Sequence, residues 1–427
     1  MAIEITIPTF HAQQQQIWNN RSTRNLVRCG RRFGKTKKIV TIASSAAIKS
    51  KKVGIFTPEH KQWLEPYYEL TSILEPVEKI FNKSEGMIRT TTKGVIDFWR
   101  LDDNPLAGRG REYDIILVDE AGFTKNGQMR DIWDKGIVST TATCVDPQFW
   151  VFSTPNGTDP ENFFWQCEHE EAMGFKVFHA PSYENPLVNK AWIEEQRKLM
   201  HPDVFRQEIM AEWVDWTGIA FFGIDKMLMA GCGVVLPRNC DSVFAVIDSA
   251  VKTGSANDGT AVIYFARSKL SGVPLILLDW DIVQIEGALL DNWLVGIHTN
   301  LEGWAKKCGA RGGISGIWVE DKASGMVLLQ QARRRKLPVK PIGGAWMQLG
   351  KDERAFSVSG YHYNEQCKLY IGAHDKVTTY KGSTKNHLES QVGTFRIGDK
   401  DAYKRADDLL DCYVHGLALT FGNSQQF

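Results

Sequence analysis

The segment RCGRRFGKTKKIV, residues 28–40, constrains the fold of this chain more than any other stretch. It follows a short apolar run that predicts a strand, and it leads into a predicted helix that begins near Lys35. Gly30 and Gly34 would let backbone N–H groups turn inward around a polyphosphate, and the N-terminus of the helix adds a favourable dipole. Lys35 would reach the β- and γ-phosphates, and the Thr36 hydroxyl would ligate Mg²⁺. The segment therefore predicts a phosphate-binding loop that takes ATP.

The first position of this loop departs from the full pattern, because Cys29 stands where a glycine is expected. A plain basic loop between a strand and a helix is the alternative interpretation. Arginines in and near the loop could stabilise the charge on a transferring γ-phosphoryl group, and sequence alone does not separate them. The candidates are Arg31, Arg32, Arg109 and Arg111.

A second nucleotide signal is the run YDIILVDEA, residues 113–121. Its four consecutive apolar residues are typical of a strand buried on both faces of a parallel sheet. The strand ends in Asp119 and Glu120. In a P-loop enzyme such an Asp holds Mg²⁺ and the following Glu polarises the attacking water. The combination with the upstream loop predicts an ATPase.

Two further segments extend the nucleotide site. An apolar strand in residues 148–157 (QFWVFSTPNG) ends in Ser153-Thr154-Pro155, where Thr154 could sense the γ-phosphate, although the same residues are also good turn formers. A short predicted helix in residues 10–18 carries glutamines. Gln14 is the candidate for contacting adenine, with a merely polar helix face as the alternative.

Composition limits the remaining options. The chain has 427 residues, of which 43% are hydrophobic and 24% charged, so two or three globular domains are expected. The net charge of +1 means that any DNA contact must come from local basic patches, such as Lys37-Lys38 and residues 333–336. No cysteine pair has zinc-site spacing, the N-terminus does not look like a secretion signal, and no apolar run approaches a membrane span, so an intracellular protein is expected, neither secreted nor membrane-bound.

The motifs CGRRFGKT, IILVDEAG, VFSTPNGT and FRQEIMAEW, in this order, resemble the ATPase half of the large terminase subunit of tailed double-stranded DNA bacteriophages. The phosphate loop of that family is often atypical in its first position and carries an arginine. The resemblance thus implies that Arg31 is catalytic, that Asp119 and Glu120 are the acidic pair, and that Ser153 to Pro155 is the coupling motif. It also implies a second domain with an RNase H-like fold and an acidic metal site.

Acidic residues meet that requirement at three places. Asp248 ends a strand that pairs with the following one in a predicted hairpin, Glu320-Asp321 ends a later strand, and a final helix begins with three aspartates. Several carboxylates at such positions could hold the two divalent ions of phosphodiester hydrolysis, although helix capping alone would explain one of the aspartates. Carried over from the family, the metal ligands would be Asp248, Glu320 and one or more of Asp407, Asp408 and Asp411, with Asp408 favoured. Asp321 and Asp258 are near enough to be alternatives.

The expected fold class is α/β, with an N-terminal P-loop (ASCE-type) ATPase domain built on a mainly parallel sheet, residues 1–213. A linker, residues 214–240, would lead to a C-terminal RNase H-like nuclease domain with a mixed sheet, residues 241–427. The resemblance implies a motor subunit that hydrolyses ATP with Mg²⁺, moves double-stranded DNA into a procapsid and cuts concatemers with two Mg²⁺ or Mn²⁺ ions. Its implied partners are the portal protein, the small terminase subunit and further copies of itself in a ring, expected to be a pentamer, in the cytoplasm of an infected bacterium.

Two other functions remain open. The first half could be a helicase-like ATPase fused to a repair or defence nuclease, although no second helicase core follows residue 240. Alternatively, the protein could be an ATPase adaptor whose second domain is not catalytic.

Overall fold

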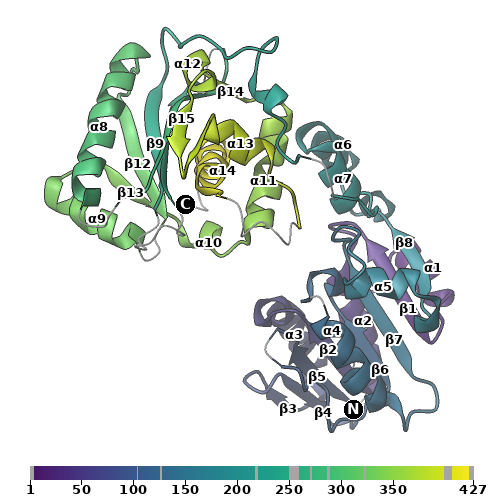
Figure 1. Ribbon diagram of the computed structural model, residues 1–427. Coiled ribbons are helices and arrows are strands. Elements are labelled where there is room, and N and C mark those ends of the chain that lie inside the picture. Colours follow the sequence, from purple (N-terminus) through teal and green to yellow (C-terminus); the bar gives the residue numbers. More distant parts are fainter. Residues whose placement is uncertain are drawn as a thin grey trace. The chain divides into compact units, whose positions relative to one another are not determined.

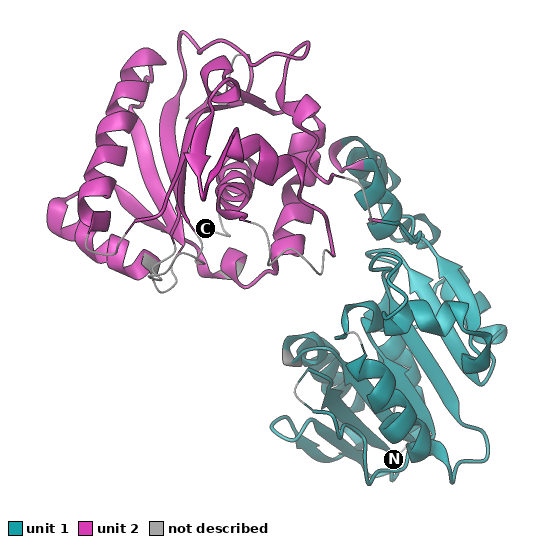
Figure 2. Cartoon of the chain, viewed as in Figure 1, with its two compact units in different colours: residues 1–198, 202–215 teal, residues 199–201, 216–427 magenta. Residues whose placement is uncertain are grey.

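The computed structural model describes residues 4–102, 104–125, 127–216, 220–249, 259–269, 272–285, 289–320, 324–398 and 406–422. The chain divides into two compact units (Figure 2), the first made of residues 1–198 and 202–215 and the second of residues 199–201 and 216–427. The predicted linker, residues 214–240, stays a prediction. Part of this stretch lies within the second unit, where Val234 forms a β-bridge with Tyr370. No helix in the described residues is long and apolar enough to cross a membrane.

The first unit is built on an eight-stranded sheet with the order β3-β4-β5-β2-β6-β7-β1-β8 (Figure 1). Its strands from β5 to β8 in this order are parallel, whereas β4 is antiparallel to both of its neighbours. The strands are β1 (Arg24–Cys29), β2 (Lys52–Thr57), β3 (Glu78–Asn82), β4 (Met87–Thr90), β5 (Val95–Arg100), β6 (Ile115–Val118), β7 (Gln148–Ser153) and β8 (Lys176–Ala180).

Helices cover both faces of this sheet, and successive strand residues alternate between the two cores as the period of a strand requires. In β6, Leu117 belongs to the core under α2 and α3, and Val118 belongs to the core under α4 and α5. This explains why the four apolar residues of β6 are all buried. The helices are α1 (Ala12–Asn19), α2 (Lys35–Ile48), α3 (His60–Leu74), α4 (Gln128–Ile132), α5 (Phe163–His169), α6 (Lys190–Leu199) and α7 (Pro202–Glu208). Short helical turns are η1 (Glu75–Val77), η2 (Ala121–Phe123), η3 (Trp133–Ile137), η4 (Val138–Thr141), η5 (Glu171–Met173) and η6 (Ser182–Glu184).

One helix of the first unit is shorter than its sequence pattern suggests. The pattern of residues 63–80 suggests a single helix, and α3 does cover the first part of this range, but it ends at Leu74 and Glu78–Asn82 forms β3. Pro76, in the turn η1, has no N–H with which to continue an α-helix, so the chain leaves the helix there.

The second unit is built on a mixed six-stranded sheet with the order β13-β12-β9-β10-β11-β14. Here β10 runs antiparallel to β9 and β11, and the other neighbours are parallel. The predicted hairpin that follows Asp248 is therefore confirmed. The strands are β9 (Ser242–Asp248), β10 (Thr260–Arg267), β11 (Leu275–Val283), β12 (Ile314–Glu320), β13 (Val339–Ile342) and β14 (Cys367–Leu369), with a separate hairpin of β15 (Thr378–Tyr380) and β16 (Ser383–Lys385).

Helices lie on opposite faces of the central strand β9. Residues Ala245 and Ile247 share a core with α8, whereas Phe244 stacks on Phe265, which contacts α14 at Gly416. The helices are α8 (Leu290–Lys307), α9 (Ser324–Arg335), α10 (Gly344–Met347), α11 (Lys351–Tyr363), α12 (Ile371–His374), α13 (His387–Gly393) and α14 (Asp408–Phe421), with a turn η7 (Ile224–Met227). This arrangement places the start of α14 beside the strands that end in Asp248 and Glu320.

Candidate nucleotide and nuclease sites

The structure shows why two positions of the phosphate loop are glycines. A side chain at Gly30 would lie 2.4 Å from the carbonyl oxygen of Ile209, and Gly34 caps α2 with a left-handed φ of 101°. The segment around α7 and β8 holds the loop from outside: Gly30 N donates to Ala180 O (3.1 Å), and Asn185 Nδ2 donates to Arg32 O (2.7 Å). The loop is thus fixed by parts of the chain more than 140 residues away.

Cys29, the departure from the usual loop pattern, points into the protein. Its side chain is fully buried in the core beneath α2, and burial raises the pKa of its thiol to about 12. Because the thiol faces the core, it does not obstruct the loop that follows.

The ends of β1, β7 and β6 are neighbours in the sheet and bring the predicted ATPase residues together. Lys35 Nζ lies 2.9 Å from Glu120 Oε1 and donates a hydrogen bond of 3.0 Å to Thr154 Oγ1. Asp119 is buried beside them, and burial together with the charge of Glu120 raises its pKa to about 7. Thr36 is half-buried in the first turn of α2. A lysine, a hydroxyl and two carboxylates therefore share one edge of the sheet.

The charges of this cluster depend on each other. Burial is the largest single effect and would lower the pKa of Lys35, but the negative charges of Glu120 and Asp119 and the hydrogen bond to Glu120 act together with the nearby Cys29 to raise the pKa above its ordinary value. Glu120 also has a left-handed backbone, with φ of 50°, which is unusual for a residue with a side chain and is often found at functional sites.

The candidate arginines differ in their surroundings. Arg31 forms an ion pair through Nε with Glu208, a carboxylate of α7 that is only 6% exposed. Arg32 is exposed and left-handed (φ 64°), and Arg111 Nε lies 3.9 Å from Asp97 Oδ2. Arg109 is exposed. The catalytic role of Arg31 stays a prediction, and Glu208 is the partner that sequence did not reveal.

Gln14 lies beside the phosphate loop, and both ends of its amide have protein partners. Its Nε2 donates to Gly34 O (2.9 Å), its Oε1 accepts from His11 N (3.2 Å), and the residue is 2% exposed. The structure thereby ties α1 to the loop through this side chain. Its contact with adenine stays a prediction.

A Gln14→Ala variant distinguishes these two roles. We expect KM to rise for ATP and GTP by similar factors, because the lost hydrogen bond to Gly34 loosens the loop for either base, at a stability cost of about 1–3 kcal/mol. Steady-state hydrolysis of both nucleotides checks this. The exposed neighbour Gln15, whose amide donates to Asn19 within α1, provides the control variant Gln15→Ala. A selective loss of the ATP preference would instead assign base recognition to Gln14.

Lys38 requires a correction. The sequence suggested that Lys37-Lys38 contacts DNA phosphates, but Lys38 is 0% exposed, and its Nζ donates to Gln14 O (2.9 Å) and lies 4.2 Å from the ring centre of Phe10. Burial, with a smaller effect of the Arg21 charge, lowers the pKa of Lys38 to about 7. The residue cannot reach DNA because its helical face packs into the core.

The buried lysine predicts a pH dependence of stability. Its pKa falls from an ordinary value of 10.5 to about 7 in the folded protein, so the unfolded state binds more protons between these values. The free energy of unfolding should therefore rise with pH from about 7 upward, by at most about 1.4 kcal/mol per pH unit from this group. Calorimetric unfolding across this range should show a smaller slope for Lys38→Met and an unchanged slope for Lys37→Met, since Lys37 is exposed and paired with Glu69. Equal slopes in all three proteins would contradict the prediction.

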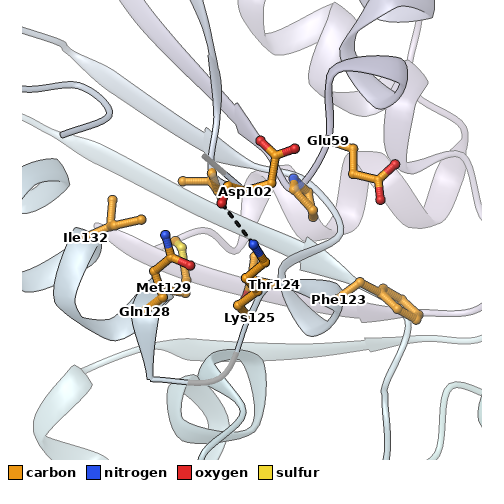
Figure 3. A pocket seen from close by; sticks show the side chains of 10 residues that line it. Glu59, Asp102, Phe123, Thr124, Lys125, Gln128, Met129 and Ile132 are labelled. Carbon is orange, nitrogen blue, oxygen red and sulfur yellow. Dashed lines mark hydrogen bonds between the residues drawn. The ribbon is translucent and has the colours of Figure 1, made fainter. Parts of the chain in front are cut away.

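Two cavities lie near the nucleotide residues. The smaller, about 90 Å³, is at the C-terminal ends of β2 and β5 beneath the segment that follows Glu120 (Figure 3), where Lys125 Nζ donates to Asp102 O (3.1 Å). Ligand pockets are usually about 300–1,000 Å³, so this space is too small for a nucleotide. The larger, about 360 Å³, lies between α1 and β8 and is lined by Gln13, Gln16, Ile17, Asn20, Lys176, Val177, Phe178 and His179.

In the second unit, the structure brings together the acids that the sequence singled out. Val319 of β12 pairs with Ile247 of β9, so Glu320 and Asp248 directly follow a paired position. The pKa of Asp248 is raised well above its ordinary value by burial and by the negative charges of Asp411, Glu320 and Asp408. Like charges act on each other so strongly only at short distance.

Basic residues of α11 neutralise part of this charge. Lys351 Nζ bonds to Asp407 and, at 2.9 Å, to Asp411 Oδ2, and Arg354 lies 3.6 Å from Asp411 Oδ1. Burial would lower the pKa of Lys351, but Asp411 and Asp407 raise it. The start of α11 therefore lies beside the acids.

The donor set suits a hard divalent cation. All of its members are carboxylates, and Asp411 Oδ1 is buried without accepting a hydrogen bond from the described residues. In the described part of the chain, however, no three His, Cys, Asp or Glu side chains are close enough to hold one ion as they stand. Lys351 draws Asp407 and Asp411 toward itself, so metal binding requires a side-chain rearrangement. Asp258 and Asp321 lie outside the described residues.

Sequence reasoning missed His415, which contacts Glu320. Its Nε2 lies 2.8 Å from Glu320 Oε1, and the residue is fully buried. The spacing of Asp408, Asp411 and His415, at i, i+3 and i+7, places all three on one helix face and was the available signal.

Comparisons with known proteins show which proteins the chain is similar to. No protein-family model matches the chain. The large terminase subunit of Thermus phage G20c is 29% identical over 142 residues, which are 30% of this chain and 28% of that protein, so the alignment spans little more than a quarter of the relative. A large terminase structure from a thermophilic bacteriophage is similar with a TM-score of 0.61 at 12% identity, covering 97% of this chain and 100% of that one. A structure of the same terminase in complex with ATP-gamma-S gives a TM-score of 0.61 at 12% identity, with 96% and 99% covered.

These findings confirm the resemblance to large terminase subunits. They also confirm the expected α/β fold, with a mainly parallel sheet in the first unit and a mixed sheet in the second.

Proposed function

We propose that this chain is the ATP-hydrolysing and DNA-cutting subunit of a viral DNA-packaging motor. The observation that carries the proposal is the meeting of Lys35, Glu120 and Thr154 within 3.0 Å at three adjacent strand ends. An independent acid cluster in the other unit supports a second chemistry. The thermophilic-phage terminase solved with ATP-gamma-S supports the choice of nucleotide.

In the ATPase unit, the backbone N–H groups of Arg32 and Gly34 would surround the phosphates, Gly30 would allow the close turn of the loop beside Ile209, and Lys35 would bind the β- and γ-phosphates. Thr36 and Asp119 would hold Mg²⁺, which supplies charge neutralisation between the β- and γ-phosphates when it is bound.

Glu120 would accept a proton from the attacking water. Arg31 would first break its ion pair with Glu208 and would then stabilise the charge on the transferring γ-phosphoryl group. Thr154, hydrogen-bonded to Lys35, would register the loss of the γ-phosphate.

In the nuclease unit, Asp248, Glu320 and Asp408 would be the principal metal ligands, with Asp411 and Asp407 available beside them. Two Mg²⁺ or Mn²⁺ ions would supply an activated water and stabilise the leaving oxygen. Lys351 and Arg354 would balance the excess negative charge of the carboxylates. Cleavage would act on concatemeric DNA at the start and end of packaging.

The motor would act on double-stranded DNA in the cytoplasm of an infected bacterium. Its partners would be the portal protein, the small terminase subunit and further copies of the chain in a ring, which we expect to be a pentamer. DNA would be held through phosphates, and Arg333 and Arg334 at the end of α9 are candidates for such contacts. Arg335 is already paired with Asp291 through two hydrogen bonds, of 2.8 and 2.9 Å, from its Nε.

The decisive experiment measures ATP hydrolysis and the nicking of supercoiled plasmid with Mn²⁺ or Mg²⁺ on the same preparation. Both activities are expected. Strand displacement on a forked duplex would favour the helicase-like alternative. A folded, ATP-binding protein that cuts no DNA with either metal would favour the adaptor alternative and overturn the nuclease assignment.

A further inference from the structure

A chain of two hydrogen bonds ends on one of the acids of the nuclease cluster. His415 Nδ1 lies 2.8 Å from the indole Nε1 of Trp346, and His415 Nε2 lies 2.8 Å from Glu320 Oε1. The imidazole is fully buried and Trp346 is 3% exposed. The function proposed above gives neither residue a role.

The direction of these hydrogen bonds follows from the chemistry of the indole. A tryptophan Nε1–H can only donate, so His415 Nδ1 must accept. The ring proton is then on Nε2, which donates to Glu320. Trp346 therefore selects the one neutral tautomer that can bind the carboxylate.

We propose that His415 is a positioning residue that fixes the carboxylate of Glu320 for metal binding, and that Trp346 sets its tautomer. This inference rests on the proposed nuclease function. A glutamate side chain has three rotatable bonds, and their freedom must be lost when the carboxylate binds a cation. The hydrogen bond from His415 holds Oε1 in advance, so less freedom is lost at the moment of binding.

The backbone around both partners is held by close contacts. A side chain at Gly416 would lie 2.3 Å from the ring of Phe265, so α14 can approach the sheet this closely only with glycine there. A side chain at Gly325 would lie 1.7 Å from the carbonyl oxygen of Glu320, which fixes the end of β12 against the start of α9. Both ends of the hydrogen bond are thus anchored by the fold.

The test compares His415→Leu, which removes the donor, with His415→Gln, whose amide can still donate. Mn²⁺ binding is measured by electron paramagnetic resonance on the full chain, together with the Mn²⁺ concentration that gives half-maximal nicking. We expect His415→Leu to weaken Mn²⁺ binding about 10- to 100-fold. His415→Gln should regain most of the loss, and Trp346→Phe should weaken binding to an intermediate degree.

His362 supplies the matched control. It is a second buried histidine of this unit, but its ring bonds to the Tyr413 hydroxyl (2.8 Å) and to Gly223 O (3.0 Å), and within the described residues it bonds to none of the clustered acids. A His362→Leu variant should therefore unfold more easily yet bind Mn²⁺ as the parent does. Because His415→Leu also removes a buried polar contact, Trp346→Phe, which is expected to weaken Mn²⁺ binding, keeps the test valid if that variant fails to fold.

The possible results distinguish a failure of this inference from a failure of the proposed nuclease function. Parent-like Mn²⁺ affinity in His415→Leu, or in Trp346→Phe if the leucine variant does not fold, would overturn the inference while leaving the nuclease intact. A parent protein that binds no Mn²⁺, or binds it equally after Asp248→Ala, would overturn the metal site itself. Weakened binding in His415→Leu and recovery in His415→Gln, with an unaffected His362→Leu control, supports the positioning role.

Discussion

Replacing Glu120 with glutamine is expected to lower the rate of ATP hydrolysis by about 10²- to 10⁴-fold, the usual contribution of a general base. The amide has nearly the same shape as the carboxylate but cannot take a proton from water. It also removes the negative charge that faces Lys35 at 2.9 Å. Nucleotide binding should persist, because the phosphate loop is unchanged. Measuring the hydrolysis rate together with the affinity for a fluorescent ATP analogue separates the two effects.

The control for this variant is Glu112→Gln, which neutralises an exposed glutamate paired with Lys52 in the same unit. It should leave hydrolysis unchanged. A Glu120→Gln protein that hydrolyses ATP as fast as the parent would show that another group positions the water, and Asp119 would then be the first residue to test.

Replacing Asp248 with asparagine is expected to reduce metal-dependent plasmid nicking by at least about 100-fold, since even outer partners of metal ligands contribute 10- to 100-fold. The loss should occur without loss of stability. The pKa of Asp248 is higher in the folded protein than in the unfolded chain. The ionised carboxylate therefore destabilises the folded state at any pH above the pKa that Asp248 has in the unfolded chain. Neutralising it should leave the unfolding temperature equal or higher at neutral pH.

Two comparisons make this prediction specific. Asp291→Asn changes a carboxylate on α8, on the opposite face of β9 from α14, and should not affect nicking. Lys35→Ala should abolish ATP hydrolysis while nicking continues, and Asp248→Asn should do the reverse. Nicking that survives in Asp248→Asn, or that disappears in Lys35→Ala, would contradict the assignment of two separate centres.

The order of the two predicted centres could be read from the sequence because each motif is local. The phosphate loop lies between β1 and α2 as its glycines and the following Lys35 require, and the apolar run before Asp119 forms β6. Strand ends carry chemistry in a parallel sheet because neighbouring strands finish at a common edge. That rule, together with the resemblance to large terminase subunits, predicted one site for Lys35, Asp119 and Thr154 and another for Asp248 and Glu320.

The partners of individual side chains could not be read in the same way. Lys38 looked like a surface cation beside Lys37 but is buried against Phe10. Two other contacts join residues that are far apart in the sequence. Arg31 forms an ion pair with Glu208, and His415 contacts Glu320. Spacing gives the face of a helix on which a residue lies, but not what that face meets.

Periodicity and turn residues act over a few neighbouring positions, so most elements, and the acids at their ends, could be predicted from the sequence alone. The hydrogen bond of the Gln14 amide to Gly34, the place of Lys351 among the aspartates and the contact of His415 with Glu320 became known only from the folded chain. Burial and hydrogen bonding depend on the packing of segments far apart in the chain, and this packing is a property of the whole fold.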